Sequence, residues 1–572
     1  MGKEENTSGS GGNLTITADT VQLTNAWLVT DGYWEGKAGD LNLTARDIQL
    51  KDFSALRASE WEGGGTVRIT ANTFLMNASA IEGETVEGIG VGERWDGVTI
   101  AADRIELRNG STIEHQTFGD GAAGNIRIMA TDHLIIADDP TPSGIKTRPG
   151  GVFTNAVVFD LGDQGLAGNI FIETGQLELS GGARIDSTTQ SSGQGGDVTI
   201  TATNGISMSG ARPLFPFEES TSVLGSRRPS GIFSRTVGSK NEVNGEPATC
   251  TDRCGDAGNI SITTGFLNLT DGAAINSGTT NDGNGGTITV NASDNILISG
   301  IIDDGTPGGV YSRTTGSELD SGKGGTIDLT AGNSFFLKDD ATVSASSEGP
   351  GNAGDIDVTA ANTILLDGAS ITTEAAQASG GNIKLTAQDL IQLNDSAISS
   401  SVQGNVTTAG GDINLDPDFI ILQNGQILAK AVQGQGGNIT LIANKAVLVD
   451  SFSTLDASSA LGVSGSVTIQ APTKFLSGAI LPLEQKPVNV AALYGARCAA
   501  GAGGHFSTFV DSQADSLSPT PGAFLASPLL NLAASAHAVA DLSAGQRAPV
   551  ILTASIAPLV LGYAGEPTTA CP

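Results

Sequence analysis

A short motif recurs along most of this chain, and its spacing constrains the fold more than any other feature. The motif is a small residue and a glycine, then Asn, Asp, Thr or Ser, and then two apolar residues separated by one other residue, as in residues 11–16, 38–43 and 64–69. Fifteen copies occur, one of them degenerate, and eleven of the fourteen intervals between them span 26 to 31 residues. A fixed interval of this size is typical of stacked repeats.

Within one repeat, the apolar residues alternate with polar ones. Residues 259–278 place Ile260 and Ile262, then Leu267 and Leu269, and then Ile275 at alternate positions. A period of two indicates strands, not helices. Glycine pairs and Asp-Gly or Asn-Gly pairs separate these short runs, as expected of turns. Each repeat therefore predicts three short strands.

Short strands of this kind bury their apolar residues only when successive repeats stack. We therefore predict an all-β chain, a right-handed parallel β-helix of about 15 coils, because crossovers between parallel strands are right-handed. Its expected limits are residues 11–471, after a disordered N-terminus at 1–10 and before a Pro- and Ala-rich cap and tail at 472–572. Leucine-rich repeats, propeller blades and calcium-binding nonapeptide repeats all have other periods.

Composition agrees with a thin, repeated core. The chain has 572 residues, 78 of them glycine, and only 5% are aromatic. Its net charge of −32 argues against nucleic-acid partners. No signal peptide is visible at the N-terminus, and no apolar stretch reaches the length of about 20 residues that spans a bilayer.

Four cysteines do not make a disulfide framework. Cys250 and Cys254 lie close together in a polar stretch, and we expect a local disulfide between them in an oxidising compartment. The alternative is two free thiols. Cys498 and Cys571 are a further candidate pair. Two sulfurs without a nearby histidine do not form a metal site, so we expect no metal and no cofactor.

Polysaccharide lyases and hydrolases are also built on β-helices, so paired acids are candidates for catalysis. The acid pairs Asp138-Asp139 and Asp303-Asp304 lie where turns are expected, and neighbouring strand residues point to opposite faces. The four histidines are scattered. We therefore expect no enzyme and no catalytic residues.

Three long intervals, of 44, 62 and 39 residues, fall in the fifth, seventh and ninth coils. Each contains a similar sequence segment, at residues 142–148, 229–235 and 307–313. If Ile145, Ile232 and Val310 point inward, the residues one and three positions later in each segment point outward. The simpler interpretation is a divergent sub-repeat whose basic residues solubilise loops. The functional interpretation is a glycan-binding face, formed by Lys146, Arg148, Phe233, Arg235, Tyr311 and Arg313.

The repeat unit resembles that of the filamentous haemagglutinin family, and more narrowly the cyanobacterial haemagglutination-activity-domain proteins. Residues 259–277 and 382–399 carry the pattern most clearly, and the resemblance covers about residues 11–470. Residues 496–510 are similar to the C-terminal segment of the same proteins. The resemblance implies export by two-partner secretion through an outer-membrane transporter, and display at the cell surface. The signal peptide and N-terminal secretion domain of the family are not seen, so we expect a fragment of a larger exported protein.

The resemblance and the repeat together favour an extracellular or cell-surface adhesin that binds glycans or cell surfaces. The alternatives are a structural filament without a ligand and, less favoured, a polysaccharide-active β-helix enzyme.

Overall fold

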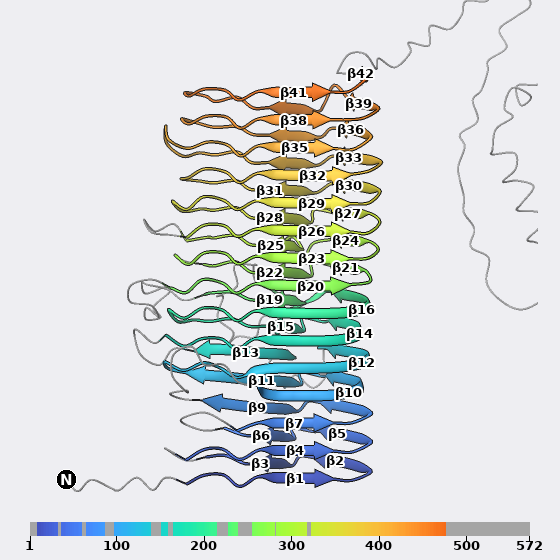
Figure 1. The fold of residues 1–572 in the computed structure, drawn as a ribbon, viewed down its shortest axis with the longest axis vertical. Coiled ribbons are helices and arrows are strands. Elements are labelled where there is room, and N and C mark those ends of the chain that lie inside the picture. The colour runs from blue at the N-terminus through green and yellow to red at the C-terminus, as the bar shows by residue number, and fades with distance from the viewer. Residues whose placement is uncertain are drawn as a thin grey trace, which may run out of the picture. The chain divides into compact units, whose positions relative to one another are not determined.

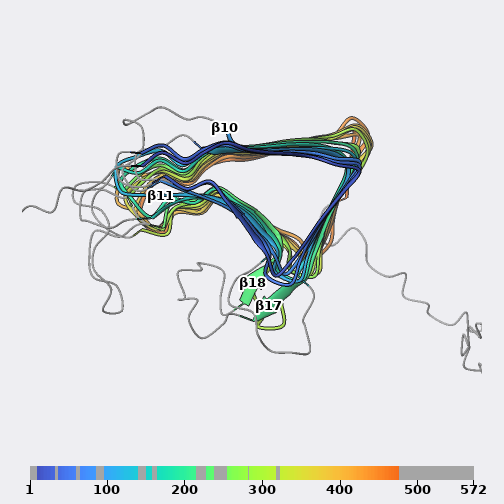
Figure 2. The ribbon, with the colours of Figure 1, turned by 90° about the horizontal axis from the view of Figure 1, so that it is seen from below.

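The computed structural model describes residues 9–32, 36–59, 65–85, 96–138, 150–157, 164–213, 227–237, 254–280, 282–316 and 322–475. The chain divides into two units, residues 1–480 and 481–572, and every described residue belongs to the first. None of the described residues is helical, and no membrane-spanning helix is found among them. In Figure 1 the strands stack as successive coils from β1 to β41, and in Figure 2 the coils superimpose as three sides of a triangle.

The first strand of each coil begins within the repeated motif, and all of these strands pair in parallel. Ile260, for example, pairs with Val198 of the preceding coil and with Ile288 of the next. These strands are β1 (Leu14–Thr17), β4 (Leu41–Thr44), β7 (Val67–Thr70), β10 (Asp96–Arg108), β12 (Asn125–Ala137), β14 (Ile170–Ser180), β16 (Val198–Ser209), β20 (Ile260–Thr264), β23 (Ile288–Ala292), β26 (Ile327–Ala331), β29 (Ile356–Ala360), β32 (Ile383–Ala387), β35 (Ile413–Asp416), β38 (Ile439–Ile442) and β41 (Val467–Gln470).

The second strands form a parallel ladder beside the first. Four long strands, β10, β12, β14 and β16, continue through the corner between the two ladders, so that both ladders belong to one 26-stranded sheet. The remaining second strands are β2 (Thr20–Thr24), β5 (Asp47–Lys51), β8 (Thr73–Asn77), β21 (Leu267–Thr270), β24 (Ile296–Ser299), β27 (Phe335–Lys338), β30 (Thr363–Asp367), β33 (Leu390–Asn394), β36 (Phe419–Gln423), β39 (Ala446–Val449) and β42 (Thr473–Phe475).

The third strands form a separate sheet of 14 strands, hereafter the third sheet. Its members are β3 (Trp27–Val29), β6 (Ala55–Arg57), β9 (Ala80–Thr85), β11 (Thr112–Phe118), β13 (Gly151–Val157), β15 (Arg184–Asp186), β19 (Gly231–Phe233), β22 (Ala274–Asn276), β25 (Gly309–Tyr311), β28 (Thr342–Ser344), β31 (Ser370–Thr372), β34 (Ala397–Ser399), β37 (Gln426–Leu428) and β40 (Thr454–Asp456). Outside the coils, β17 (Ala211–Pro213) and β18 (Arg227–Pro229) form a small antiparallel pair.

The core lies inside the coils, where alternate side chains of all three strands meet. Ile262, Leu269 and Ile275 of one coil are fully buried. Ile275 pairs with Ile232 on one side and Val310 on the other, so each inward position continues as an apolar column. Burial of this apolar surface is the main stabilising contribution to such a fold.

The polar residue of the motif links each coil to the next. The side-chain oxygen of Asn259 accepts a hydrogen bond of 2.9 Å from the backbone N–H of Thr287, and Asp197 accepts one of 2.8 Å from Asn259. Two residues after the inward residue of the third strand, a hydroxyl group donates a hydrogen bond to a glycine carbonyl of the motif. Ser234 does so to Gly196 at 2.7 Å. Buried backbone groups at this corner thereby find partners.

The turn between the second and third strands explains the Asp-Gly pairs. Asp271 has a φ of 53° and Gly272 a φ of 81°, the left-handed region that Asp, Asn and Gly adopt most readily.

The predicted parallel β-solenoid is confirmed, with 14 strands in the third sheet against about 15 expected coils. The last strand in the described part of the chain, β42, ends at Phe475, slightly beyond the expected limit at residue 471.

Candidate functional site

The outer face of the third sheet around β13 to β25 carries an aromatic side chain in every second coil. In β19, Ile232 points into the core and Phe233 belongs to a separate cluster outside it, together with Ala274 and Tyr311. The strand pairing places five side chains in one outer column: Phe153, Asp186, Phe233, Asn276 and Tyr311.

The register of the fifth coil differs from the sequence prediction. β13 runs over Gly151–Val157, and Val152, not Ile145, is the inward residue paired with Ile185. Phe153 therefore occupies the outer position that was predicted for Lys146. Lys146 and Arg148 themselves lie outside the described residues.

The aromatic rings point outward as predicted, but they are not exposed. Phe233 is 0% and Tyr311 2% exposed. Each ring folds back over a glycine two residues earlier in its own strand. A Cβ atom at Gly231 would lie 3.1 Å from the ring of Phe233, and one at Gly309 would lie 3.1 Å from the hydroxyl oxygen of Tyr311. The prediction of an accessible aromatic row is therefore wrong for these residues.

Tyr311 is held further by its hydroxyl group, which donates a hydrogen bond of 2.7 Å to the carbonyl oxygen of Pro307. Burial raises the pKa of this hydroxyl to about 12. The chain between β24 and β25 also forms an antiparallel bridge from Ile301 to Pro307. Tyr311 thus fastens this loop to the sheet.

Arginines lie against the aromatic rings. The guanidinium carbon of Arg184 is 4.2 Å and that of Arg235 is 5.0 Å from the ring centre of Phe233. Arg313 is placed in the same way, 4.7 Å from the ring centre of Tyr311. Guanidinium groups stack favourably on aromatic faces.

Buried charge at this face is partly compensated by one carboxylate. Asp186 lies 3.8 Å from Arg184 and 3.6 Å from Arg235. The pKa of Arg184 is lowered by burial and by the nearby positive charges of Arg228 and Arg235, and Asp186 acts in the opposite direction. Arg235 is 8% exposed, so the predicted exposed arginine row is also wrong at this position, whereas Arg313 is partly exposed.

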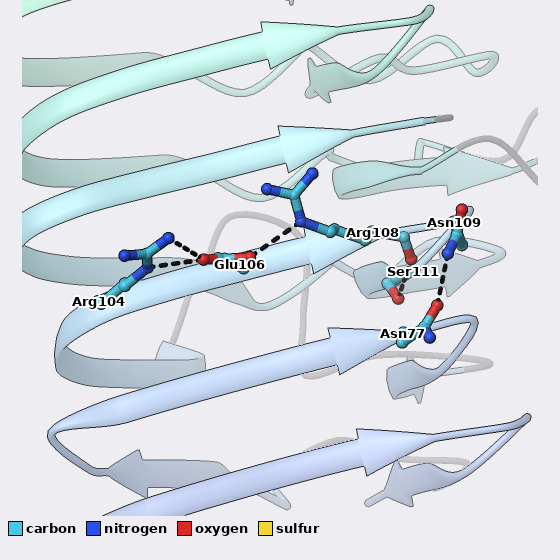
Figure 3. A network of polar contacts seen from close by, with 6 residues as sticks. All are labelled: Asn77, Arg104, Glu106, Arg108, Asn109 and Ser111. Atoms are coloured by element: carbon cyan, nitrogen blue, oxygen red, sulfur yellow. Dashed lines mark hydrogen bonds and ion pairs between the residues drawn. The ribbon is translucent and has the colours of Figure 1, made fainter. Parts of the chain in front are cut away.

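Several arginines elsewhere on the described surface are paired with carboxylates. Glu106 accepts hydrogen bonds from both Arg104 and Arg108 on β10 (Figure 3). Burial raises the pKa of Glu106, but the hydrogen bonds from the two arginines outweigh it, so the net pKa is lowered. Within the described part of the chain, Arg313 has no such carboxylate partner.

The other sequence candidates give a mixed result. Cys254 is disulfide-bonded and 1% exposed. Cys250 lies outside the described residues, as do Cys498 and Cys571. Asp138 is buried and paired with Arg212 at 3.2 Å. Asp303 and Asp304 are exposed in a turn, as expected. No cluster of three or more metal-ligating side chains is found in the described ranges.

Sequence reasoning missed Phe153 and Arg184. A signal for Phe153 existed, because residues 149–153 (Pro-Gly-Gly-Val-Phe) repeat residues 307–311 (Pro-Gly-Gly-Val-Tyr) almost letter for letter. Nothing comparable marks Arg184, whose role depends on a ring in the following coil.

A hollow of about 230 Å³ lies among Asp340, Ser370, Asp395, Asn424 and Gln426. Its lining holds carboxylates and small polar groups but no aromatic or basic side chain. It offers no feature of a glycan site beyond its acidity.

Comparisons with protein-family models, with curated proteins and with solved structures found no match. The resemblance to filamentous haemagglutinins therefore stays a prediction that is compatible with the β-solenoid.

Proposed function

We propose that this chain is part of an extracellular, filamentous-haemagglutinin-like adhesin that binds acidic glycans. The support is a rigid β-solenoid, the repeat motif that it shares with that family, and the disulfide at Cys254, since disulfides persist in oxidising compartments. By the same resemblance, its export partner would be an outer-membrane transporter of the two-partner type.

The observation that carries the proposal is the concentration of aromatic–arginine pairs on one face. Phe233 with Arg235 and Tyr311 with Arg313 lie in the coils whose longer intervals flank the third strand. Residues on loops that a rigid scaffold holds in place are common in recognition sites. In a chain of net charge −32, arginines gathered on one face favour an anionic ligand.

The test is retention of the full chain on immobilised polysaccharides. We expect retention on sulfated or uronate-containing polymers at low salt, and none on neutral dextran. Retention should fall as salt approaches about 0.15 M or above, because exposed charges are then screened over about 8 Å. Equal retention on neutral and acidic polymers, or none on either, would contradict an acidic-glycan adhesin.

A structural filament without a ligand is the second candidate, and the burial of Phe233 and Tyr311 favours it. In that case the aromatic–arginine pairs only fasten loops to the sheet. The retention experiment separates the two functions, because a filament of this kind would pass through both columns.

A further inference from the structure

Trp27 lies across the outer face of the third sheet, where β3 pairs it with Ala55 of the second coil. Its indole Nε1 donates a hydrogen bond of 3.2 Å to the carbonyl oxygen of Phe53, and the guanidinium carbon of Arg57 is 5.9 Å from the ring centre. Phe53 and Arg57 lie two residues before and two residues after Ala55, which is outside the core and yet only 5% exposed. The ring of Trp27 therefore covers Ala55 with one face and turns the other to solvent, so that Trp27 is 59% exposed.

Phe53 is a second exposed aromatic residue, in the turn that adjoins Trp27. It is 63% exposed and has a φ of 66°. The equivalent turns of two later coils, which close with the same backbone hydrogen bond, place Gly182 and Gly272 at this position. A bulky residue is rarely found in the left-handed region, and an exposed one gains little from burial there. The needs of the turn therefore do not account for an aromatic side chain at position 53.

A polar pair, Arg57 and Asp31, lies beside the ring of Trp27. Nε and Nη2 of Arg57 both donate to one carboxylate oxygen of Asp31, the first at 2.9 Å, and the other oxygen accepts a hydrogen bond of 3.1 Å from the backbone N–H of Ser59. These bonds fix the guanidinium plane, while Nη1 of Arg57 has no hydrogen-bond partner among the described residues. Because the two charges compensate each other, the pair offers donors and acceptors without a net charge.

We infer that Trp27, Phe53 and the Arg57–Asp31 pair bind uncharged, β-1,4-linked pyranose units of a polysaccharide. Pyranose rings with equatorial substituents expose flat C–H faces that pack on aromatic rings, and their hydroxyls donate and accept hydrogen bonds at the ring edge. Trp27 and Phe53 come from successive coils about 4.8 Å apart, a spacing close to the length of one unit in an extended sugar chain. A flat β-linked chain can therefore contact both residues, whereas α-linked chains such as maltohexaose or dextran present no continuous flat face. This site goes beyond the proposed function, which concerns acidic units at the coils with long intervals.

Isothermal titration calorimetry of the full chain with cellohexaose, a flat β-1,4-linked glucose chain, tests this site, and maltohexaose is the control sugar. The test variants are Trp27→Ala and Phe53→Ala, which remove exposed rings and should leave the fold intact by circular dichroism. The matched control is Phe452→Ala, which removes a ring that is 76% exposed from the turn before β40. Trp27→Phe keeps a smaller flat ring without the indole N–H group.

We expect the wild type to bind cellohexaose and not maltohexaose. Trp27→Ala should weaken this binding about tenfold or more and Phe53→Ala by a smaller factor, because each removes a stacking surface. Phe452→Ala should match wild type, and Trp27→Phe should retain part of the binding.

The site is overturned if cellohexaose does not bind, if maltohexaose binds equally well, or if Trp27→Ala binds like wild type. A wild-type dimer in sedimentation velocity that Trp27→Ala abolishes, without any sugar binding, would also overturn it, in favour of a protein contact. Cellohexaose binding that depends on Trp27, without retention on the acidic columns, would leave this site and overturn the acidic-glycan adhesin. Retention on those columns without cellohexaose binding would do the reverse.

Discussion

His115 lies inside the solenoid at a position that the neighbouring coil fills with a hydroxyl side chain, that of Thr154. Its Nδ1 accepts a hydrogen bond of 2.9 Å from the backbone N–H of Gly124. Gly83 and Gly97 leave the room that the imidazole ring needs, since a Cβ atom at either would lie within 2.4 Å of ring Cδ2. Burial lowers the pKa of His115 to about 4.

This pKa predicts an acid-sensitive step in stability. The unfolded chain protonates His115 near pH 6.5, whereas the folded chain resists protonation until about pH 4. The stability that the neutral ring supports is therefore complete above pH 6.5 and is lost progressively as the pH falls to 4. The total is about 3 kcal/mol, at roughly 1.4 kcal/mol per pKa unit.

Urea unfolding at pH 7 and pH 4.5 measures this contribution. We expect the loss of unfolding free energy between the two pH values to be about 2 kcal/mol smaller in His115→Gln than in wild type. Comparing the two proteins cancels the titration of the many carboxylates. An identical pH dependence would mean that His115 is not buried as a neutral ring.

For single residues, the sequence predicted the direction in which the side chains of Phe233 and Tyr311 point, but not what surrounds them. Alternation along a strand is enough to point Phe233 and Tyr311 away from Ile232 and Val310. Their burial depends on contacts that no single repeat contains, such as Arg184 stacking on Phe233 from the preceding coil. The exposure of an outward side chain is therefore not readable from its own strand.

Among the elements, β32 offers the clearest test of inward and outward positions. Ile383 is fully buried, and the adjacent Lys384 is exposed and paired with Asp357 at 3.2 Å. We expect Ile383→Asp to lower the free energy of unfolding by about 4 kcal/mol or more, because a buried carboxylate has no compensating partner. Lys384→Asp loses only an exposed ion pair and should cost about 1 kcal/mol at most.

Denaturant midpoints of the two variants decide between these outcomes. Similar midpoints would show that the two side chains do not occupy opposite faces of β32.

The strands were largely predictable, because each coil repeats the same local pattern of residues. Three short alternating runs, a glycine-rich corner and an Asp-Gly turn recur, and the strands follow them, as β20, β21 and β22 do. The fifth coil was the exception. In that coil two similar segments, residues 142–148 and 149–153, are both candidates for the third strand. Only the pairing of Val152 with Ile185 identifies the second segment as the strand. Register between coils is a property of the stack, which a single repeat does not encode.

For the whole molecule, the repeat predicts that coils are interchangeable units. Asp355 and Asn382 begin successive coils 27 residues apart and are joined by a hydrogen bond of 2.7 Å. Deleting residues 355–381 joins Gly354 directly to Asn382 and would stack β26 on β32 with Ile327 beside Ile383. Solenoid stability is approximately a sum over neighbouring repeats. We therefore expect this deletion to leave a folded, cooperatively unfolding protein.

A deletion of residues 355–368 serves as the control, because it removes the first two strands of a coil and leaves the third. It should disrupt the stack locally and lower the unfolding midpoint far more than the full-coil deletion. Far-ultraviolet circular dichroism and urea unfolding of both proteins provide the comparison. Equal damage from the two deletions would contradict independent coils.

The hydrogen bonds that join successive coils, such as the one that the Thr287 N–H donates to Asn259, run along the stacking direction. A force that pulls the two ends of the stack apart therefore acts on every coil boundary in series, and separation begins at the boundary with the fewest bonds. A force applied across the stack is shared by many boundaries at once. Attachment through the third-sheet face, as proposed, would load the stack sideways, the direction in which it resists rupture best.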